Sequence, residues 1–424
     1  MNLSRRSLML TGAAAVGASI LAPRARAELS GDKKHLIVLF AYGGWDTTYA
    51  LDPKPGLATV DAPSGAVTMF GELPIYTNLT RPSVTSFFQK YGAITAVING
   101  IQVRSLNHPD CSKRILTGTQ SDASPDLGSI VAYELGRSLP APYLVLGPSA
   151  YSGPLASIAT RAGTVNQLRS LLDPAAAFPK AAPFDTPRYA ADGAESDLIR
   201  QYLLARTERE RATRGQLGYN AARFEDFLSS LERRDVLKGF SDGFGDDFTF
   251  TLDLNMQIGL ALDAIERGVC HSVHLEQAFA TWDTHANNAP QDTMHEQLYA
   301  ALTLLVDQLA ARPGSQSGRT MLDDTVVAVF SEMGRTPKLN AAGGKDHWPV
   351  TSALVLGSGV RGGRVYGASD NQLQAMNVDL HSGAPDPNGE QLQYGNLAAG
   401  ILTLAGVDPA PYLANLEVFD AIVA

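Results

Sequence analysis

The chain has 424 residues, of which 45% are hydrophobic and 18% are charged, and its formal net charge at pH 7 is −9. A chain of this length and composition can bury a large core, either as one large α/β domain or as two smaller ones. Its Lys and Arg residues are mostly scattered, so nucleic acid is not expected as a partner, because phosphate binding needs clustered cations.

The first 27 residues have the pattern of a twin-arginine export signal. Arg5 and Arg6 precede an apolar run over residues 8–21, and "ARA" at 25–27 supplies a small-x-small cleavage pattern. A retained membrane anchor is the alternative, but the run is short and rich in Gly, Ala and Ser. We therefore expect a periplasmic or secreted protein with no stable membrane insertion after the signal is cleaved.

The sequence contains two cysteines, Cys111 and Cys270, which cannot form a disulfide framework. One bridge between them stays open at this point, and two separately buried thiols are the simpler expectation.

After the signal, "HLIVLFA" is a continuous apolar run that stops at a Gly-Gly pair, as in a strand buried on both faces. Asp46 follows just past its end. Asp is favoured in caps and turns, so a capping role and a metal-ligand role are both open for it.

A Pro- and Gly-rich loop is expected over residues 52–74, followed by a helix in "SVTSFFQKYG" and a buried strand in "AITAVING". In "NHPDCSKRILTG", Pro109 suits a first helical turn and Gly118 suits a helix end. His108 then lies at the positive end of a helix, where it is either a surface or capping residue or a catalytic one.

Residues 151–250 are expected to form a helical insertion or cap over the main sheet. The segment 152–184 is rich in Ala, Pro and Ser, and 195–235 is helical in pattern and strongly charged. The rest of the mature chain, 28–424, is expected to be a single domain.

Further strands are expected in "APYLVLG", "HSVHLEQ", "DDTVVAVFSE" and "TSALVLGSG", and helical patterns lie between and after them. This alternation predicts an α/β fold with a doubly wound, mostly parallel central sheet and helices on both faces.

Acidic and imidazole side chains follow several of these strands. They are Asp46, Asp283, His285, Glu332, Asp346 and His347. Because the carboxyl ends of parallel strands meet at one edge of a sheet, we expect these side chains to form a metal site. Mixed His and carboxylate ligands suit Zn, Mn or Fe better than Ca, with Zn or Mn the leading candidates.

Six motifs together resemble the domain of unknown function 1501 family. They are "GGWD", "NHPDCSKRILTG", "WDTHANN", "FSEMGRTP", "GGKDHWP" and "GSGVRGGRVYG". That family is similar to the alkaline phosphatase and sulfatase superfamily, its members are commonly exported by the twin-arginine route, and its activity is not established. The resemblance covers nearly all of the mature chain and implies the superfamily's fold and site.

By this resemblance, Asp46 corresponds to a metal carboxylate after the first strand, and His108 stands where the superfamily has its Ser, Thr or formylglycine nucleophile. Asp283 and His285 resemble the Asp and His of one metal site, although one residue separates them instead of three. The remaining correspondences are Glu332 for an Asp, Met333 for its His partner, and His347 for the final metal histidine, with Asp346 as an added candidate.

The departures favour a single metal ion, because a thioether such as Met333 is a poor ligand for a hard divalent ion. Without a hydroxyl nucleophile, attack by metal-activated water fits better than a covalent intermediate. Arg335 could hold an anionic group bidentately, and an ion pair to Glu332 or to a surface carboxylate is the alternative. His108 and Arg335 are thus the catalytic candidates.

The leading hypothesis is an exported metal-dependent hydrolase of a phosphate or sulfate ester, with an anionic small molecule or envelope polymer as substrate. The alternative is a non-catalytic periplasmic binding or assembly protein that keeps the fold with a structural metal or polar site. The sequence specifies neither the substrate nor the oligomeric state.

Overall fold

The computed structural model describes residues 34–161, 193–216, 218–241, 253–277 and 282–424. The predicted export signal lies outside these residues, and so does much of the segment 152–184. No helix of the described residues is both long enough and apolar enough to cross a bilayer.

An eight-stranded sheet forms the centre of the fold, in the order β12-β4-β11-β8-β1-β7-β5-β6. Its strands, in chain order, are β1 His35–Ala41, β4 Thr95–Gln102, β5 Tyr143–Val145, β6 Ala159–Arg161, β7 Ser272–Gln277, β8 Thr325–Phe330, β11 Val350–Gly357 and β12 Arg364–Gly367. Among these strands only β11 runs antiparallel to its neighbours. The predicted mostly parallel, doubly wound sheet is therefore confirmed.

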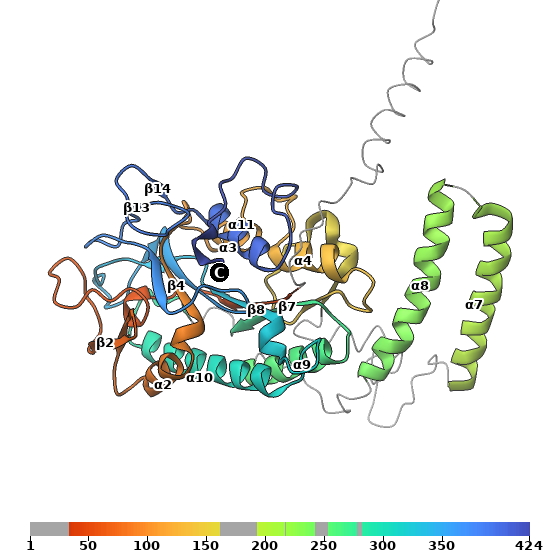
Figure 1. The fold of residues 1–424 in the computed structure, drawn as a ribbon, viewed down its shortest axis with the longest axis horizontal. Coiled ribbons are helices and arrows are strands. Elements are labelled where there is room, and N and C mark those ends of the chain that lie inside the picture. The colour runs from red at the N-terminus through yellow and green to blue at the C-terminus, as the bar shows by residue number, and fades with distance from the viewer. Residues whose placement is uncertain (1–33, 162–192, 217, 242–252, 278–281) are drawn as a thin grey trace, which may run out of the picture. The chain divides into compact units, whose positions relative to one another are not determined.

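Helices cover both faces of the sheet (Figure 1). On one face α2 Pro82–Tyr91, α9 Leu254–Glu266 and α10 Pro290–Ala311 pack against alternate residues of β1. On the other face the packing helices are α3 His108–Thr117, α4 Leu127–Gly136 and α11 Tyr394–Leu404. Since both faces are covered, β1 is buried from Leu36 to Ala41, as its continuous apolar sequence predicts.

The prediction of a loop over residues 52–74 was wrong. The predicted loop over residues 52–74 contains β2 Ala66–Phe70, which forms an antiparallel hairpin with β3 Leu73–Thr77. In the region expected as an insertion, residues 159–161 form β6, an edge strand of the central sheet. Helices α7 Gly193–Arg214 and α8 Gly218–Ser241 agree with the helical pattern predicted for this region.

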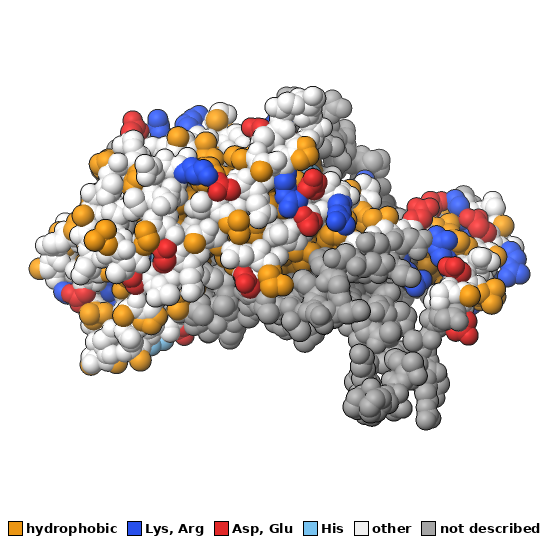
Figure 2. Space-filling model, turned by 90° about the horizontal axis from the view of Figure 1, so that it is seen from below, with side chains coloured by type: hydrophobic (Ala, Val, Ile, Leu, Met, Phe, Trp, Pro, Cys, Tyr) orange, Lys and Arg blue, Asp and Glu red, His pale blue; other side chains and the backbone are white. Residues whose placement is uncertain are grey.

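Cys111 and Cys270 are both buried and unpaired, as the simpler expectation held. Figure 2 shows one face of the molecule, where Lys and Arg side chains alternate with Asp and Glu among scattered hydrophobic ones. The described part of that face has no continuous basic area.

Short elements complete the described chain. They are η1 Thr47–Tyr49, η2 Gly92–Ile94, η3 Gly153–Ile158, β9 Gly334–Arg335, β10 His347–Trp348, η5 Met321–Asp324, β13 Asn377–Val378, β14 Glu390–Gln391 and η6 Asp420–Ile422.

Candidate metal centre

The centre lies at the carboxyl ends of β1 and β8, which are neighbours in the sheet with Phe40 opposite Phe330. Beyond these ends, the Gly43 amide donates to both carboxylate oxygens of Glu332, at 2.9 and 3.1 Å. Gly43 has φ +123°, and a Cβ there would lie 2.8 Å from the amide nitrogen of Asp283. Only glycine therefore lets the β1 loop pass this close to the segment that contains Asp283.

His108 is the first residue of α3, and the Asn107 side chain caps that helix by accepting from the Asp110 amide at 3.2 Å. The ring Nδ1 of His108 lies 2.6 Å from Glu332 Oε1. Its Nε2 is buried, and no described residue forms a hydrogen bond with it.

The other two histidines are held in the same way. His285 Nδ1 lies 2.8 Å from Asp346 Oδ1, and His347 Nδ1 lies 2.7 Å from the Leu106 carbonyl oxygen. Carboxylate and carbonyl oxygens only accept hydrogen bonds, so each Nδ1 is assigned the proton and each Nε2 an unprotonated lone pair.

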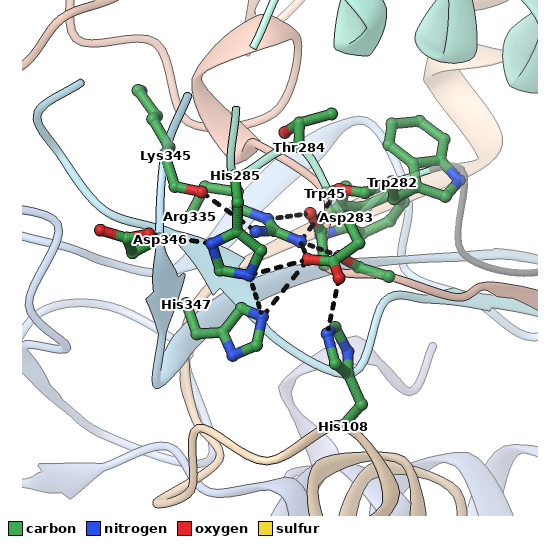
Figure 3. A network of polar contacts seen from close by, with 12 residues as sticks. Trp45, His108, Trp282, Asp283, Thr284, His285, Arg335, Lys345, Asp346 and His347 are labelled. Atoms are coloured by element: carbon green, nitrogen blue, oxygen red, sulfur yellow. Dashed lines mark hydrogen bonds and ion pairs between the residues drawn. The ribbon is translucent and has the colours of Figure 1, made fainter. Parts of the chain in front are cut away.

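These Nε2 atoms converge on Asp283 (Figure 3). They lie 3.5 Å (His108), 3.1 Å (His285) and 3.3 Å (His347) from its carboxylate oxygens. His285 Nε2 and His347 Nε2 are 2.9 Å apart. Donor atoms of His108, Asp283 and His347 all lie within 4.8 Å of one another. Lone pairs and a carboxylate gathered without bridging protons repel one another, so the residues fit a divalent cation.

Arg335 fixes Asp283 in place. Its Nη2 lies 2.7 Å from Asp283 Oδ1, and its Nε and Nη1 donate to the carbonyl oxygens of Gly44 at 2.8 Å and Lys345 at 3.1 Å. Nη2 also donates to the carbonyl oxygen of Trp282 at 3.0 Å, and the side chain is fully buried. Arg335 thus makes an ion pair, but with Asp283 instead of Glu332. This geometry does not support the prediction that Arg335 holds a substrate anion.

The pKa values follow these contacts. Burial lowers the pKa of His108, but the hydrogen bond and charge of Glu332 outweigh burial, so that pKa lies above its ordinary value. Burial lowers the pKa of His347. For Asp283, burial acts to raise the pKa, and Arg335 with the nearby histidines outweighs it, so the carboxyl has a lowered pKa and is ionised near neutral pH.

Asp46 does not join the cluster, which corrects its prediction as a ligand. Its Oδ2 lies 2.7 Å from Lys345 Nζ, and both side chains are fully buried. Thr48 donates to Oδ1 through its amide at 3.1 Å and its hydroxyl at 2.7 Å, and Asn288 Nδ2 donates to Oδ2 at 2.8 Å. Asp46 is the N-cap of η1, which confirms the capping alternative. Lys345 was missed, although its place inside "GGKDHWP" was a signal for a site role.

Glu332 and Asp346 were also predicted as ligands. In the structure their carboxylates instead contact the Nδ1 atoms of His108 and His285, on the side of each ring away from Nε2. Met333 packs with Val103 and Cys111 in a buried apolar cluster, so it supplies no ligand to the centre. Asp283, His285 and His347 are brought together as predicted. His108, predicted at the nucleophile position, joins them as a donor.

A separate open cavity lies elsewhere on the molecule. It has a volume of about 660 Å³, is lined in part by Asp52, Asn99 and Arg364, and contains none of the four clustered side chains. The cavity and the centre are thus separate features, and the chemistry is assigned to the centre because the donor atoms converge there.

Residues 255–417 match the family model described as "Protein of unknown function (DUF1501)", which confirms the resemblance over that region. No curated protein matches the chain. Solved structures of similar fold include Ps i-CgsB in complex with k-i-k-neocarrahexaose (10% identity, TM-score 0.41, 91% of this chain and 75% of that chain). Another is the PsFucS1 sulfatase from Pseudoalteromonas sp. (12% identity, TM-score 0.36, 98% and 75%). A third is the phosphonate monoester hydrolase of Agrobacterium radiobacter (12% identity, TM-score 0.31, 91% and 78%). At these identities the likeness concerns the fold alone.

Proposed function

We propose that this protein is a metal-dependent hydrolase of sulfate or phosphate esters that uses one divalent ion, held by His108, Asp283 and His347. The observation that supports it is the convergence of imidazole nitrogens on the Asp283 carboxylate, with donor atoms of the three residues within 4.8 Å of one another. Three protein donors leave a coordination position open, as in catalytic sites, whereas structural zinc sites are closed by four.

Imidazole nitrogens and a carboxylate suit Zn or Mn. Such an ion polarises an ester oxygen and makes water a better nucleophile near neutral pH. Residues next to the ligands hold the ligand side chains in position for the ion. Glu332 and the Leu106 carbonyl fix the two ligand rings through their Nδ1 atoms, and Arg335 fixes the carboxylate.

A single ion fits better than two, because Lys345 already supplies a positive charge to Asp46. The ammonium lies 2.7 Å from that carboxylate in a fully buried pair. A second cation would have to displace it, which would leave the lysine charge buried without a partner.

We assign His285 the role of proton acceptor. Its side chain is 44% exposed, Asp346 holds its Nδ1, and its Nε2 lies 3.1 Å from Asp283 Oδ1 in the centre. Ser331 Oγ, next to Glu332, is not a free nucleophile, because it donates to the Ala41 carbonyl at 2.8 Å and accepts from the Trp45 amide at 3.0 Å. Water attack assisted by a histidine base follows from this geometry.

The competing function is a non-catalytic binding or assembly protein with a structural metal. In that case His285 would be a fourth ligand that closes the site. Its Nε2 lies 3.1 Å from Asp283 and 2.9 Å from His347 Nε2, which is the observation that favours this alternative.

Metal analysis of the purified full chain separates the two. We expect one equivalent of Zn or Mn in wild type, its loss in His108→Ala and His347→Ala, and its retention in His285→Ala. His381→Ala is the matched control, since His381 pairs with Asp420 away from the centre. The same proteins are then assayed with aryl sulfates, aryl phosphates and bis-aryl phosphates.

Turnover lost in His285→Ala with metal retained supports the hydrolase. Metal lost in all three variants, with no turnover by wild type, supports the structural site. Wild type without stoichiometric metal contradicts both.

The export route is part of the proposal and rests on the sequence of residues 1–27. Replacement of Arg5 and Arg6 by Lys should keep the protein in the cytoplasm of a bacterial host, measured by cell fractionation. An unchanged distribution would contradict twin-arginine export.

A further inference from the structure

Arg104 lies in the connection between β4 and α3, one end of which touches the metal centre. The carbonyl oxygen of Leu106, two residues later, accepts from His347 Nδ1 at 2.7 Å. Two residues of chain span at most about 7 Å, so the backbone of Arg104 lies within about 7 Å of the residue that holds the ligand ring.

The backbone of Arg104 is held in the left-handed region, with φ 59°. This conformation is unfavourable for a residue with a Cβ and persists only where neighbours impose it. Arg114 Nη1 donates to the carbonyl oxygens of Val103 at 3.0 Å and Arg104 at 2.7 Å, which fixes the connection to α3. The backbone at Arg104 is therefore fixed by its surroundings.

Other cations around the centre already have partners. Arg335 pairs with Asp283 at 2.7 Å and Lys345 with Asp46 at 2.7 Å. On α3, Arg114 pairs with Asp110 at 2.9 Å and Lys113 with Asp122 at 2.6 Å.

Arg104 differs from these cations. Arg104 is exposed, and none of the described residues forms an ion pair with its guanidinium.

The carboxylates of Asp283, Glu332 and Asp346 surround the centre, and Arg335 offsets one of them. Two negative charges then remain, and a divalent ion balances them without leaving a positive charge for an anionic ester. Such an ester would therefore be repelled by the carboxylates as it approaches the site. A free cation at the edge of the site would relieve that repulsion.

We infer that Arg104 binds the negatively charged group of the substrate, which makes the substrate an ester with a sulfate or phosphate oxyanion. A guanidinium matches two oxygens of such a group at once, which an ammonium does not. This inference rests on the proposed function for the identity of the site, and it moves the anion-binding role from Arg335 to Arg104.

The test measures binding of inorganic sulfate and phosphate to the full chain by calorimetry, with Zn loaded and without it. The variants are Arg104→Ala, Arg104→Lys and Arg104→Gly. Arg137→Ala is the matched control, because Arg137 is also an exposed arginine, at the end of α4.

We expect Arg104→Ala and Arg104→Gly to weaken oxyanion binding by about 10- to 100-fold, the range for a lost charged hydrogen bond. Arg104→Lys should lose less, and Arg137→Ala nothing. Metal content should be unchanged in all of them. Arg104→Gly should melt at a higher temperature than Arg104→Ala, because glycine accepts the left-handed backbone. That comparison separates the side chain's role from the backbone's.

Oxyanion binding by Arg104→Ala equal to wild type, or no oxyanion binding by wild type, would overturn the inference. Turnover is not part of this readout. If binding depends on Arg104 but no ester is hydrolysed, the hydrolase proposal fails and the anion site stands.

Discussion

Lys345 Nζ lies 2.7 Å from Asp46 Oδ2, and neither side chain has exposed surface. Burial acts to raise the pKa of Asp46, but the charge and hydrogen bond of Lys345 outweigh it and lower that pKa. Removing one partner of a buried pair leaves an uncompensated charge. We expect Lys345→Met to lower the free energy of unfolding by about 3–5 kcal/mol, measured by urea denaturation.

The matched control is Lys338→Met. Lys338 lies 2.7 Å from Asp61, with exposed side-chain fractions of 53% and 37%. We expect this change to cost less than about 1 kcal/mol, since water screens the pair. Equal losses in the two variants would mean that the Asp46–Lys345 pair is not buried as described.

Glu332→Gln tests whether Glu332 orients His108. The amide oxygen can still accept from Nδ1, but the charge that strengthens the hydrogen bond is lost. We expect metal affinity to fall by about 10- to 100-fold, measured by competition with a chelator. An affinity matching that of His108→Ala would instead show that Glu332 is itself a ligand.

Gly344→Ala tests the close approach of two loops. A Cβ at Gly344 would lie 2.0 Å from the His285 carbonyl oxygen, whereas one at Gly343 would meet nothing within 4 Å. We expect Gly344→Ala to cost about 3 kcal/mol, the upper range for overpacking, and to reduce metal binding because the His285 segment must move.

Gly343→Ala is the control, and its φ of +79° limits the cost to backbone strain of about 1 kcal/mol. Equal stability of the two variants would contradict the described loop contact.

His295 makes stability pH-dependent. Burial, with a smaller contribution from Arg81, lowers its pKa to about 3. The folded state then binds fewer protons than the unfolded state between that value and the ordinary pKa near 6.5. Its contribution is therefore complete above pH 6.5 and is lost as pH falls.

At pH 5 the loss is about 2 kcal/mol. Between pH 7.5 and pH 5, the free energy of unfolding should therefore fall by about 2 kcal/mol less in His295→Phe than in wild type. Denaturant unfolding at each pH measures this difference. Parallel pH profiles would contradict a neutral, buried His295.

The sequence predicted the buried strands well because a strand covered on both faces must be apolar throughout, as β1 and β8 are. It missed the β2–β3 hairpin because most residues of β2 are exposed or half-buried, so no apolar pattern marks it. The reversed direction of β11 has no signal at all, since burial does not depend on strand direction. His295 is fully buried against Tyr49 and Trp45, a position that a histidine in an otherwise amphipathic helix does not reveal.

The sequence motifs identified the chain segments that come together at the metal centre. They did not show which side chains bind the metal and which ones orient a ligand. Whether a carboxylate binds a metal or orients a histidine depends on ring orientation and on distances of a few tenths of an ångström. Glu332 and Asp346 contact the Nδ1 atoms of His108 and His285, whereas Asp283 contacts Nε2 of His108. Asp46 could not be separated from the ligands without knowing that Lys345 reaches it.

The region that matches the family model, residues 255–417, includes Asp283, His285 and His347 but neither His108 nor β1. In the sheet, β1 lies between β7 and β8. A polypeptide cut down to that region would have two open strand edges facing a gap, and such edges invite association with other chains. His108, the donor that α3 contributes, would also be missing. A second sequence that matches the family model over this region alone should therefore be assigned the same chemistry only if it also has a histidine at the position of His108.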